Sequence, residues 1–309
     1  MDKKNARLIF MGTPDIARDC LSQLIEDGYN ITAVFTREDK PVGRKQIMTA
    51  PPVKTVALDH GIPVYQPKTL KGETGDIIKG LQPDLIAVVA YGRILPANVI
   101  EMPTCGCLNL HVSLLPKYRG AAPIQWAVIN GDNQTGVTVM HINEGLDTGD
   151  IVDVLPVEIG DDETADELFE DVAEKGKVFF SKVIEKVLSG NYTRTPQDDS
   201  KATFAPPLTK EMSRFELSDD VNVVYNKIRG QNPWPGTDFL CDGKKVKVIK
   251  ARKSAKSGKP GEILSLKPLT VSLSGGSLEM LTVQPEGSKA MDGTAWARGR
   301  RFKIGDIIQ

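Results

Sequence analysis

The residues best suited to chemistry are an amide, an imidazole and a carboxylate near the middle of the chain. Asn109 and His111 stand two residues apart at the end of an apolar run, so on a strand their side chains point to the same face. Asp147 follows within EGLDTGDI and could orient or charge the imidazole. An oxyanion donor, a proton shuttle and an orienting carboxylate are what transfer through a tetrahedral carbon requires.

No Ser, Cys or Lys nucleophile is obviously paired with these three residues, which favours direct transfer between two bound substrates over a covalent intermediate. Structural roles remain open for each of them: turn capping for Asn109, a satisfied buried imidazole for His111 and turn geometry for Asp147. We interpret the other two histidines, His60 and His141, as structural.

Length and composition indicate an ordinary globular protein. The 309 residues suit about two domains, and no apolar run approaches the roughly 18 residues of a membrane span. The start, MDKKNARLIFMG, leads straight into an apolar strand pattern, so we expect a cytoplasmic protein and, by default, a monomer. The four cysteines are scattered and form no C-x-x-C motif, which predicts ordinary thiols. The sequence also lacks an H-E-x-x-H motif, so we expect no metal site.

The charge is unevenly distributed along the chain. Residues 1–205 carry 21 Lys and Arg against 29 Asp and Glu, whereas residues 206–309 carry 18 against 11. An acidic part joined to a basic part favours a polyanionic partner for the second. Chance unevenness of surface charge is the alternative.

The first part of the chain alternates strand and helix patterns, which predicts a mostly parallel sheet with helices on both faces, a Rossmann-like α/β fold. Gly12-Thr13-Pro14 predicts a turn in which Thr13 caps the next helix. G-x-G-x-x-G is absent there, so we expect no nicotinamide or flavin. Substrates in such folds bind beyond the carboxyl ends of the strands. The strands are expected at 7–11, 31–35, 63–64, 85–90, 107–110 and 136–141.

The second part has a different pattern. Residues 163–189 predict an amphipathic helix interrupted only at Gly176, and 191–207, rich in Thr, Asp, Ser and Pro, predict an extended linker. A helix at 221–229 and short strands at 239–250, 261–266, 270–273 and 278–284 then favour a small β-barrel of the oligonucleotide-binding (OB-like) type. The expected domains are a catalytic domain at 1–190, a linker at 191–207 and a basic β-barrel at 208–309.

Several segments together resemble a known family. They are MGTPDIA at the start, VVAYGRILP at 88–96, NLHVSLLPKYRGAAPIQWAVINGD from Asn109, EGLDTGDI at 144–151 and PWPGT at 233–237. With them the chain resembles the 10-formyltetrahydrofolate-dependent formyltransferases, and among these the methionyl-tRNA formyltransferases, over nearly its whole length. The Asn-x-His pattern with a downstream Asp is specific for the chemistry and less so for the acceptor.

The resemblance implies a reaction and roles. A formyl group would pass from 10-formyltetrahydrofolate to the α-amino group of methionine on initiator Met-tRNA, with neither metal nor nucleotide cofactor. Asn109 and protonated His111 would stabilise the tetrahedral oxyanion, and Asp147 would hold the imidazole and favour its charged form. Ser113, Leu114, Leu115 and Pro116 would line the folate pocket, and backbone groups around Val89, Tyr91 and Gly92 would hold the pterin ring. Lys117 stands where Arg is usual, which leaves a bidentate contact there in doubt.

The acceptor is implied by two basic regions. Residues 39–53 form a connection longer than the usual 2–6 residues, and the resemblance implies that its tip, Gly43, Arg44 and Lys45, contacts the acceptor end of tRNA, with Arg44 foremost. The C-terminal lysines, among them Lys244, Lys245 and Lys247, suit salt-sensitive phosphate contacts. The aromatic residues Trp234, Trp296 and Phe302 could stack on bases, although a barrel core is the expected place for them.

Other functions remain open. A folate-dependent formyltransferase acting on a small amine, or a formyltetrahydrofolate hydrolase, would use the same donor site. Neither needs the basic loop tip or the basic C-terminal part. A tRNA-binding module with a decayed catalytic domain is disfavoured by the intact Asn109, His111 and Asp147.

Overall fold

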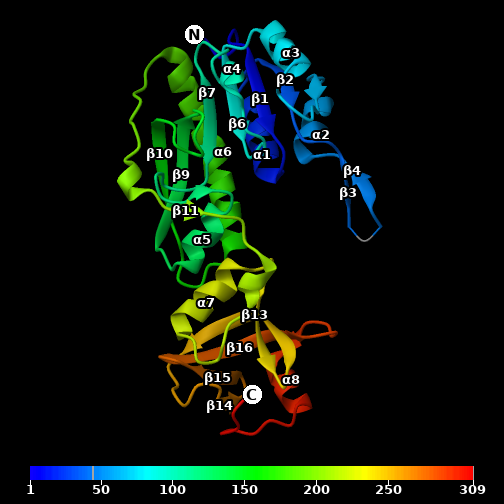
Figure 1. Ribbon diagram of the computed structural model, residues 1–309, viewed down its shortest axis with the longest axis vertical. Coiled ribbons are helices and arrows are strands. Elements are labelled where there is room, and N and C mark those ends of the chain that lie inside the picture. The colour runs from blue at the N-terminus through cyan, green and yellow to red at the C-terminus, as the bar shows by residue number, and fades with distance from the viewer. Residues whose placement is uncertain (44, 309) are drawn as a thin grey trace. The chain divides into compact units, whose positions relative to one another are not determined.

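The computed structural model of the protein describes residues 1–43 and 45–308. The chain divides into two compact units that each draw on separated segments. The first unit comprises Met1–Gly120, Gly136–Val157 and Glu170–Phe204, and the second comprises Ala121–Thr135, Glu158–Phe169 and Ala205–Gln309. Figure 1 shows the elements in chain order, from blue to red.

A seven-stranded sheet forms the centre of the first unit, in the order β10-β9-β7-β6-β1-β2-β5. Strands β1, β2, β5, β6 and β7 pair in parallel, while β9 runs antiparallel to β7. Every residue of β1 and β6 is buried, as expected of strands covered on both faces. The expected mostly parallel α/β sheet is confirmed. Its strands are β1 Leu8–Gly12, β2 Ile31–Phe35, β5 Val64–Tyr65, β6 Leu85–Val89, β7 Cys107–His111, β9 Gln134–His141 and β10 Ile151–Glu158.

The helices of the first unit are α1 Asp15–Glu26, α2 Pro52–Asp59, α3 Glu73–Leu81 and α4 Ala97–Ile100, and α6 Ala165–Ser189 extends into it from the second. The expectation that Thr13 caps α1 is wrong. Pro14 occupies the N-cap position, and the Thr13 hydroxyl instead donates to the Tyr91 carbonyl, 3.2 Å away. Helix α6 continues unbroken through Gly176, where an added Cβ would lie 3.4 Å from Val137 of β9. Because glycine removes bulk there, the helix packs directly on the sheet.

The connection at 39–53 is not a plain loop. It contains a two-stranded hairpin, β3 Lys40–Val42 and β4 Ile47–Thr49, whose residues are all exposed. Figure 1 shows this hairpin projecting from the sheet. This hairpin was not predicted from the sequence, because a strand with both faces in solvent has no alternation of apolar and polar residues.

Most of the residues expected to form an extended linker, 191–204, belong to the first unit, and 205–207 belong to the second. Thr195 pairs with Ile151 at the start of β10, and η1 (Asp199–Lys201) is followed by β11 (Phe204–Ala205), which pairs with β8 (Arg119–Gly120). The segment therefore contacts the polypeptide on either side of the predicted catalytic residues.

An antiparallel sheet forms the second unit, in the order β12-β13-β16-β15-β14 with β17 beside β16. This confirms an antiparallel β domain after the α/β part. The single strand expected at 239–250 is in fact a hairpin, because Asp242 and Gly243 both have positive φ and turn the chain. The strands of the six-stranded sheet are β12 Thr237–Cys241, β13 Lys244–Ser254, β14 Ile263–Leu266, β15 Leu269–Leu273, β16 Gly276–Pro285 and β17 Met291–Asp292. The helices of the second unit include α5 Pro123–Ile129, α7 Val221–Gly230 and α8 Gly293–Gly299.

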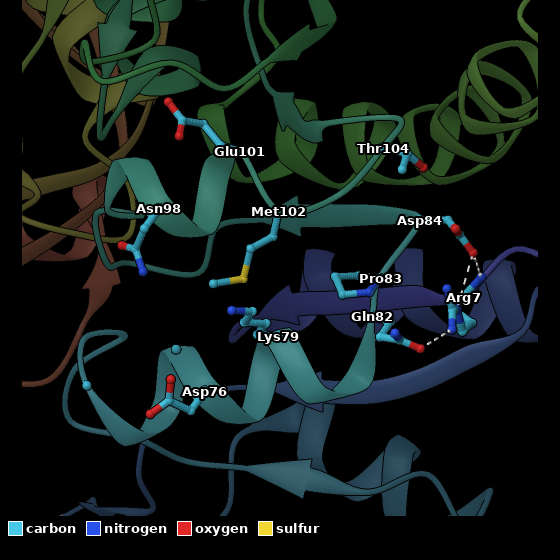
Figure 2. Close-up of a pocket in the computed structure, with 12 residues that line it drawn as sticks. Arg7, Asp76, Lys79, Gln82, Pro83, Asp84, Asn98, Glu101, Met102 and Thr104 are labelled. Carbon is cyan, nitrogen blue, oxygen red and sulfur yellow. Dashed lines mark hydrogen bonds and ion pairs between the residues drawn. The ribbon is translucent and has the colours of Figure 1, made fainter.

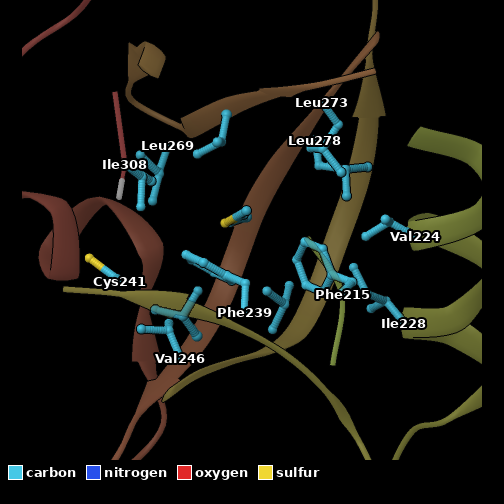
Figure 3. Close-up of a cluster of buried hydrophobic side chains, with 14 of the residues drawn as sticks. Phe215, Val224, Ile228, Phe239, Cys241, Val246, Leu269, Leu273, Leu278 and Ile308 are labelled. Carbon is cyan, nitrogen blue, oxygen red and sulfur yellow. The ribbon is translucent and has the colours of Figure 1, made fainter. Parts of the chain in front are cut away.

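The core of the second unit lies between α7, α8 and this sheet. Figure 3 shows Val224 and Ile228 of α7 directed toward Phe215 and the strands. Trp296 is buried and meets Phe239 and Phe302 edge to face, so the expected core role is confirmed for it. Trp234 is 53% exposed, and the core expectation is wrong for that residue.

Helix α7 also packs against α5. A Cβ on Gly230 would lie 2.5 Å from the Ile129 side chain and 3.1 Å from the Gln125 carbonyl oxygen, so glycine permits the two helices to approach closely. Next to it the buried Arg229 donates to the carbonyls of Gly160 and Glu163. The Tyr225 hydroxyl donates to Asp162. Segments of the sequence before residue 170 thus belong structurally to the C-terminal part.

None of the helices in the described ranges 1–43 and 45–308 has both the length and the apolar composition needed to cross a membrane.

Candidate active site

The predicted catalytic amide and imidazole lie on β7, near the carboxyl end of the parallel strands. Asn109 pairs with Val88 on one side and Met140 on the other, and His111 pairs with Thr138. Cys107, on the same face, packs into the apolar cluster under α3 and α4, whereas Asn109 is half-buried. No described residue forms a hydrogen bond with the Asn109 side chain. Its amide is therefore available to a ligand.

The His111 imidazole is 6% exposed and has a partner on each nitrogen. Nε2 lies 2.9 Å from the Tyr118 carbonyl oxygen, and because a carbonyl only accepts, Nε2 carries a proton in this bond. Nδ1 faces Asp147, with 3.7 Å between Nδ1 and Oδ2. The structure thus brings His111 and Asp147 together, as predicted, and leaves Nδ1 as the nitrogen that can exchange its proton.

Two strained backbone positions surround this imidazole. Tyr118 has φ +62 and Asp147 has φ +51, in the left-handed region that costs a non-glycine residue on the order of 1–3 kcal/mol. Asp147 Oδ2 also accepts the Gly120 N–H at 2.8 Å. Such strain persists only where the surrounding contacts enforce it, and it is common at functional sites.

The predicted folate-lining residues 113–116 form the turn after β7. Ser113 is fully buried and its hydroxyl donates to the Lys117 carbonyl, so the hydroxyl is not paired with the imidazole. Thr138 Oγ1 donates to the Ser113 carbonyl and accepts from the Leu115 N–H. Leu115 is buried, while Leu114 and Pro116 are partly exposed. Only the latter two offer side-chain surface to a ligand.

The other predicted folate residues follow β6. Val89 and Tyr91 are buried and Gly92 is exposed with φ +74. The carbonyl oxygens of Tyr91 and Gly92 already accept from Thr13 and Arg37. Among the described residues, none accepts a hydrogen bond from the backbone N–H of Tyr91 or Gly92. This segment therefore offers backbone donors at the carboxyl ends of the strands.

The predicted tRNA-binding residues lie in two hairpins. Gly43 and Lys45 are exposed beside the turn of β3–β4, and Arg44 lies outside the described residues. Lys244 and Lys245 are exposed at the start of β13, next to the β12–β13 turn. Lys247 is half-buried and donates to the Pro235 carbonyl.

Three residues of this site were not identified from the sequence: Arg119, Gln197 and Thr203. The Gln197 amide donates to the carbonyls of Asp147 and Gly149, Arg119 donates to Gln197 and Asp199, and Thr203 bonds to the chain at 116–119. Arg119 lies within the segment from Asn109 that carries the family resemblance, whereas the neighbours of Gln197 and Thr203 carry no pattern that distinguishes them from loop residues. Only the fold brings them beside His111.

A cavity of about 730 Å³ opens at the opposite ends of the strands. Arg7, Asp84 and Thr104 line it and precede β1, β6 and β7. Figure 2 shows Arg7 paired with Gln82 and Asp84, and residues of α3 and α4 facing one another across the cavity. Because the predicted reactive residues lie toward the carboxyl ends, this cavity is separate from the candidate site.

The cysteines are all free thiols, and three of the four are buried, as expected. Burial raises the pKa of the Cys107 thiol to about 12, so this cysteine, two residues from Asn109, stays protonated at neutral pH. Within residues 1–43 and 45–308, no three His, Cys, Asp or Glu side chains are grouped to hold a metal ion.

The buried ring of His141 is expected to make the stability of the protein depend on pH. Its ring is 6% exposed, packs against Tyr192, and has an Nε2 atom without a partner among the described residues. Burial, with a contribution from Arg194, lowers the pKa of His141 to about 4. The unfolded chain, with an ordinary pKa near 6.5, takes up this proton first as the pH falls. The folded state is therefore expected to lose stability as the pH falls from about 6.5 to 4.

We expect His141→Leu to flatten this dependence. Between pH 7 and pH 5 the native protein should lose about 2 kcal/mol more unfolding free energy than the variant, measured by urea denaturation at both pH values. His60→Leu, which changes an exposed histidine at the end of α2, is the matched control and should keep the native slope. Equal slopes for native protein and His141→Leu would show that His141 is not the responsible group.

Comparison with known proteins identifies two family matches in the chain. Residues 5–184 match a family described as formyl transferase, and residues 207–301 match one described as formyl transferase, C-terminal domain. A curated relative from Geobacter metallireducens, named methionyl-tRNA formyltransferase, is 41% identical over 96% of this chain and 97% of its own length. One of the same name from Halalkalibacterium halodurans is 40% identical over 98% of both chains.

Solved structures share the fold at lower identity. An N-formyltransferase from Helicobacter canadensis, solved in complex with folinic acid and dTDP-3-aminofucose, aligns with a TM-score of 0.69 at 19% identity. The alignment covers 94% of this chain and all of the other. This similarity extends the shared architecture across both parts of the chain.

Proposed function

The chain belongs to the formyl transferase family, and we propose that it transfers a formyl group from 10-formyltetrahydrofolate to the α-amino group of methionine on initiator Met-tRNA. The observation that carries this proposal is the length of the match. Relatives named methionyl-tRNA formyltransferase share 41% and 40% identity over 96% and 98% of the chain. The match therefore includes the C-terminal part of the chain as well as the part that carries Asn109, His111 and Asp147.

In the proposed reaction the uncharged amine attacks the formyl carbon and a tetrahedral oxyanion forms. The free amide of Asn109 donates to this oxyanion, as does His111 when protonated. The proton lost by the attacking nitrogen passes through the imidazole to N10 of the folate, and the C–N10 bond breaks. Because Nε2 is bonded to the Tyr118 carbonyl, Nδ1 carries the mobile proton. Asp147, 3.7 Å from Nδ1, supports the charged imidazole.

The arrangement around His111 supports direct transfer. The Ser113 hydroxyl is committed to the Lys117 carbonyl, and burial keeps the Cys107 thiol protonated. We propose that the folate lies between the exposed surface of Leu114 and Pro116 and the segment at Val89, Tyr91 and Gly92. The two N–H groups at Tyr91 and Gly92 would then face the pterin.

We propose two tRNA contacts, at Gly43, Arg44 and Lys45 and at the start of β13. Lys244 and Lys245 are exposed there, whereas Lys247 is partly engaged by Pro235. These contacts suit a first unit that performs the transfer and a second unit that holds tRNA, the second consisting of the expected domain at 208–309 together with segments before residue 170. A cytoplasmic monomer suits an enzyme that meets tRNA before translation begins.

The acceptor is tested by supplying labelled 10-formyltetrahydrofolate with Met-charged initiator tRNA, with charged elongator tRNA, with a small amino sugar in place of tRNA, and without any acceptor. We expect label on the initiator tRNA alone. Equal label on both tRNAs would contradict initiator specificity. Formate release without tRNA would identify a hydrolase, and label on a small sugar amine in place of tRNA would identify a small-amine formyltransferase.

A further inference from the structure

The segment 195–203, which we call the strap, runs beside the reactive imidazole and is bonded at both ends. Thr195 and Ile151 exchange backbone hydrogen bonds of 2.9 and 2.8 Å at its start. At its end the Thr203 carbonyl accepts from the Arg119 N–H at 2.8 Å, and the Thr203 N–H donates to the Pro116 carbonyl at 3.2 Å. The strap is therefore fixed between β10 and the chain that follows β7.

Thr203 holds Tyr118, the residue that contacts Nε2 of the His111 imidazole. Its hydroxyl accepts the Tyr118 N–H at 2.9 Å, which adds a third bond between Thr203 and residues 116–119. Tyr118 has φ +62, and its carbonyl accepts the hydrogen bond from His111 Nε2. Holding this strained residue keeps the acceptor aimed at the ring, and thereby fixes which nitrogen is protonated.

Gln197 controls the Nδ1 side. Its Nε2 donates to the carbonyls of Asp147 at 2.9 Å and Gly149 at 2.8 Å, which holds Asp147 at φ +51. In that conformation the Asp147 carboxylate accepts the Gly120 N–H and faces His111. Two bonds from one amide thus fix the backbone of the residue that pairs with the imidazole.

Arg119 fixes the orientation of the Gln197 amide. Its guanidinium is 4% exposed and donates to Gln197 Oε1 from both Nε and Nη2, at 3.1 and 2.8 Å. Because a guanidinium only donates, the amide oxygen must face Arg119 and the NH2 group must face the two carbonyls. Arg119 also pairs with Asp199 at 2.7 Å, which compensates the buried charge.

We propose that Gln197 is a positioning residue for the formyl transfer, with Arg119 orienting its amide and Thr203 bracing the opposite side of His111. This role rests on the proposed function, because it acts through Asp147 and His111. The segment that joins the two domains in the sequence is therefore part of the support of the catalytic group.

Gln197→Glu tests this role with little change in volume. In this variant one carboxylate oxygen can still accept both hydrogen bonds from Arg119. The other oxygen faces the carbonyls of Asp147 and Gly149, to which it cannot donate, so both of these hydrogen bonds are lost. A displacement of about 1 Å can cost on the order of 100-fold. We expect kcat with Met-tRNA to fall by about that factor while KM for both substrates stays within about threefold. Exchange of the Gly120 amide proton should accelerate, and that of Leu110 within the sheet should not.

Ser200→Ala is the matched control, because Ser200 lies in the strap and bonds only to Asp198 among the described residues. It should keep the native kcat and the native Gly120 exchange. The proposal is overturned if Gln197→Glu keeps native kcat or native Gly120 protection, or if Ser200→Ala reproduces the loss. If the native protein proves inactive on Met-tRNA but Gly120 exchange still responds, the proposed function fails and the positioning role stands.

A second variant keeps the test decisive if Gln197→Glu does not fold. Thr203→Val preserves shape and backbone bonds and removes only the acceptor of the Tyr118 N–H. We expect kcat to fall about fivefold to tenfold, the loss that corresponds to one neutral hydrogen bond. Native kcat in Thr203→Val would contradict the bracing role.

Discussion

Replacing Asn109 by alanine is expected to lower kcat by about 100- to 1000-fold, the typical loss when one oxyanion donor is removed. The Asn109 side chain is half-buried near the carboxyl end of the sheet and bonds to no other described residue. Its removal therefore leaves no partner unsatisfied, and the unfolding free energy should change by less than about 1 kcal/mol. Saturating single-turnover kinetics and urea denaturation measure the two quantities.

Asn98→Ala provides the matched control for this experiment. Asn98 lines the cavity at the opposite ends of the strands, so the same chemical change there should leave kcat within about twofold of native. A native kcat in Asn109→Ala would exclude Asn109 as the oxyanion donor. A large loss of stability would instead assign it a structural role.

Replacing Asp147 by asparagine is expected to lower kcat by about 100-fold or more. The amide oxygen can still accept the Gly120 N–H, so the loop should keep its conformation. The negative charge 3.7 Å from His111 Nδ1 is lost, and a proton shuttle that cannot hold its charged form forfeits much of the 100- to 10,000-fold supplied by general acid–base catalysis. Both KM values should change little.

Asp153→Asn makes the same substitution in an exposed ion pair with Lys186, where a salt bridge contributes little. It should retain native kcat and native stability. If Asp147→Asn also turns over at the native rate, the carboxylate does not support the imidazole during transfer. A defect confined to KM would place Asp147 in substrate binding.

Much of this arrangement follows from local pattern. The apolar runs that became β1 and β6 are continuous, because both faces of these strands are covered. The spacing of Asn109 and His111 then places both side chains on one face, and the structure has them so. The pairing of His111 with Asp147 spans 36 residues, and it was predicted from residue type and family resemblance.

The contacts that could not be predicted from the sequence are polar and join residues far apart in the chain. Gln197 and Thr203 lie in a stretch rich in Thr, Asp, Ser and Pro, where composition indicates only irregular chain. Their roles arise from hydrogen bonds to residues 50 and 85 positions earlier. The β12–β13 hairpin was different, because Asp242-Gly243 is a strong local signal for a tight turn and was available in the sequence.

The contact between α5 and α7 has a consequence for how the chain can be divided. Trp126 donates to the Pro206 carbonyl and Ile129 packs against Gly230. A cut at residue 205 would therefore remove both of these contacts from α5. The N-terminal piece would then expose a newly uncovered helix face and be prone to self-association. Exchange of the second unit among relatives should therefore carry α5 together with α7, since this unit is not contiguous in the sequence.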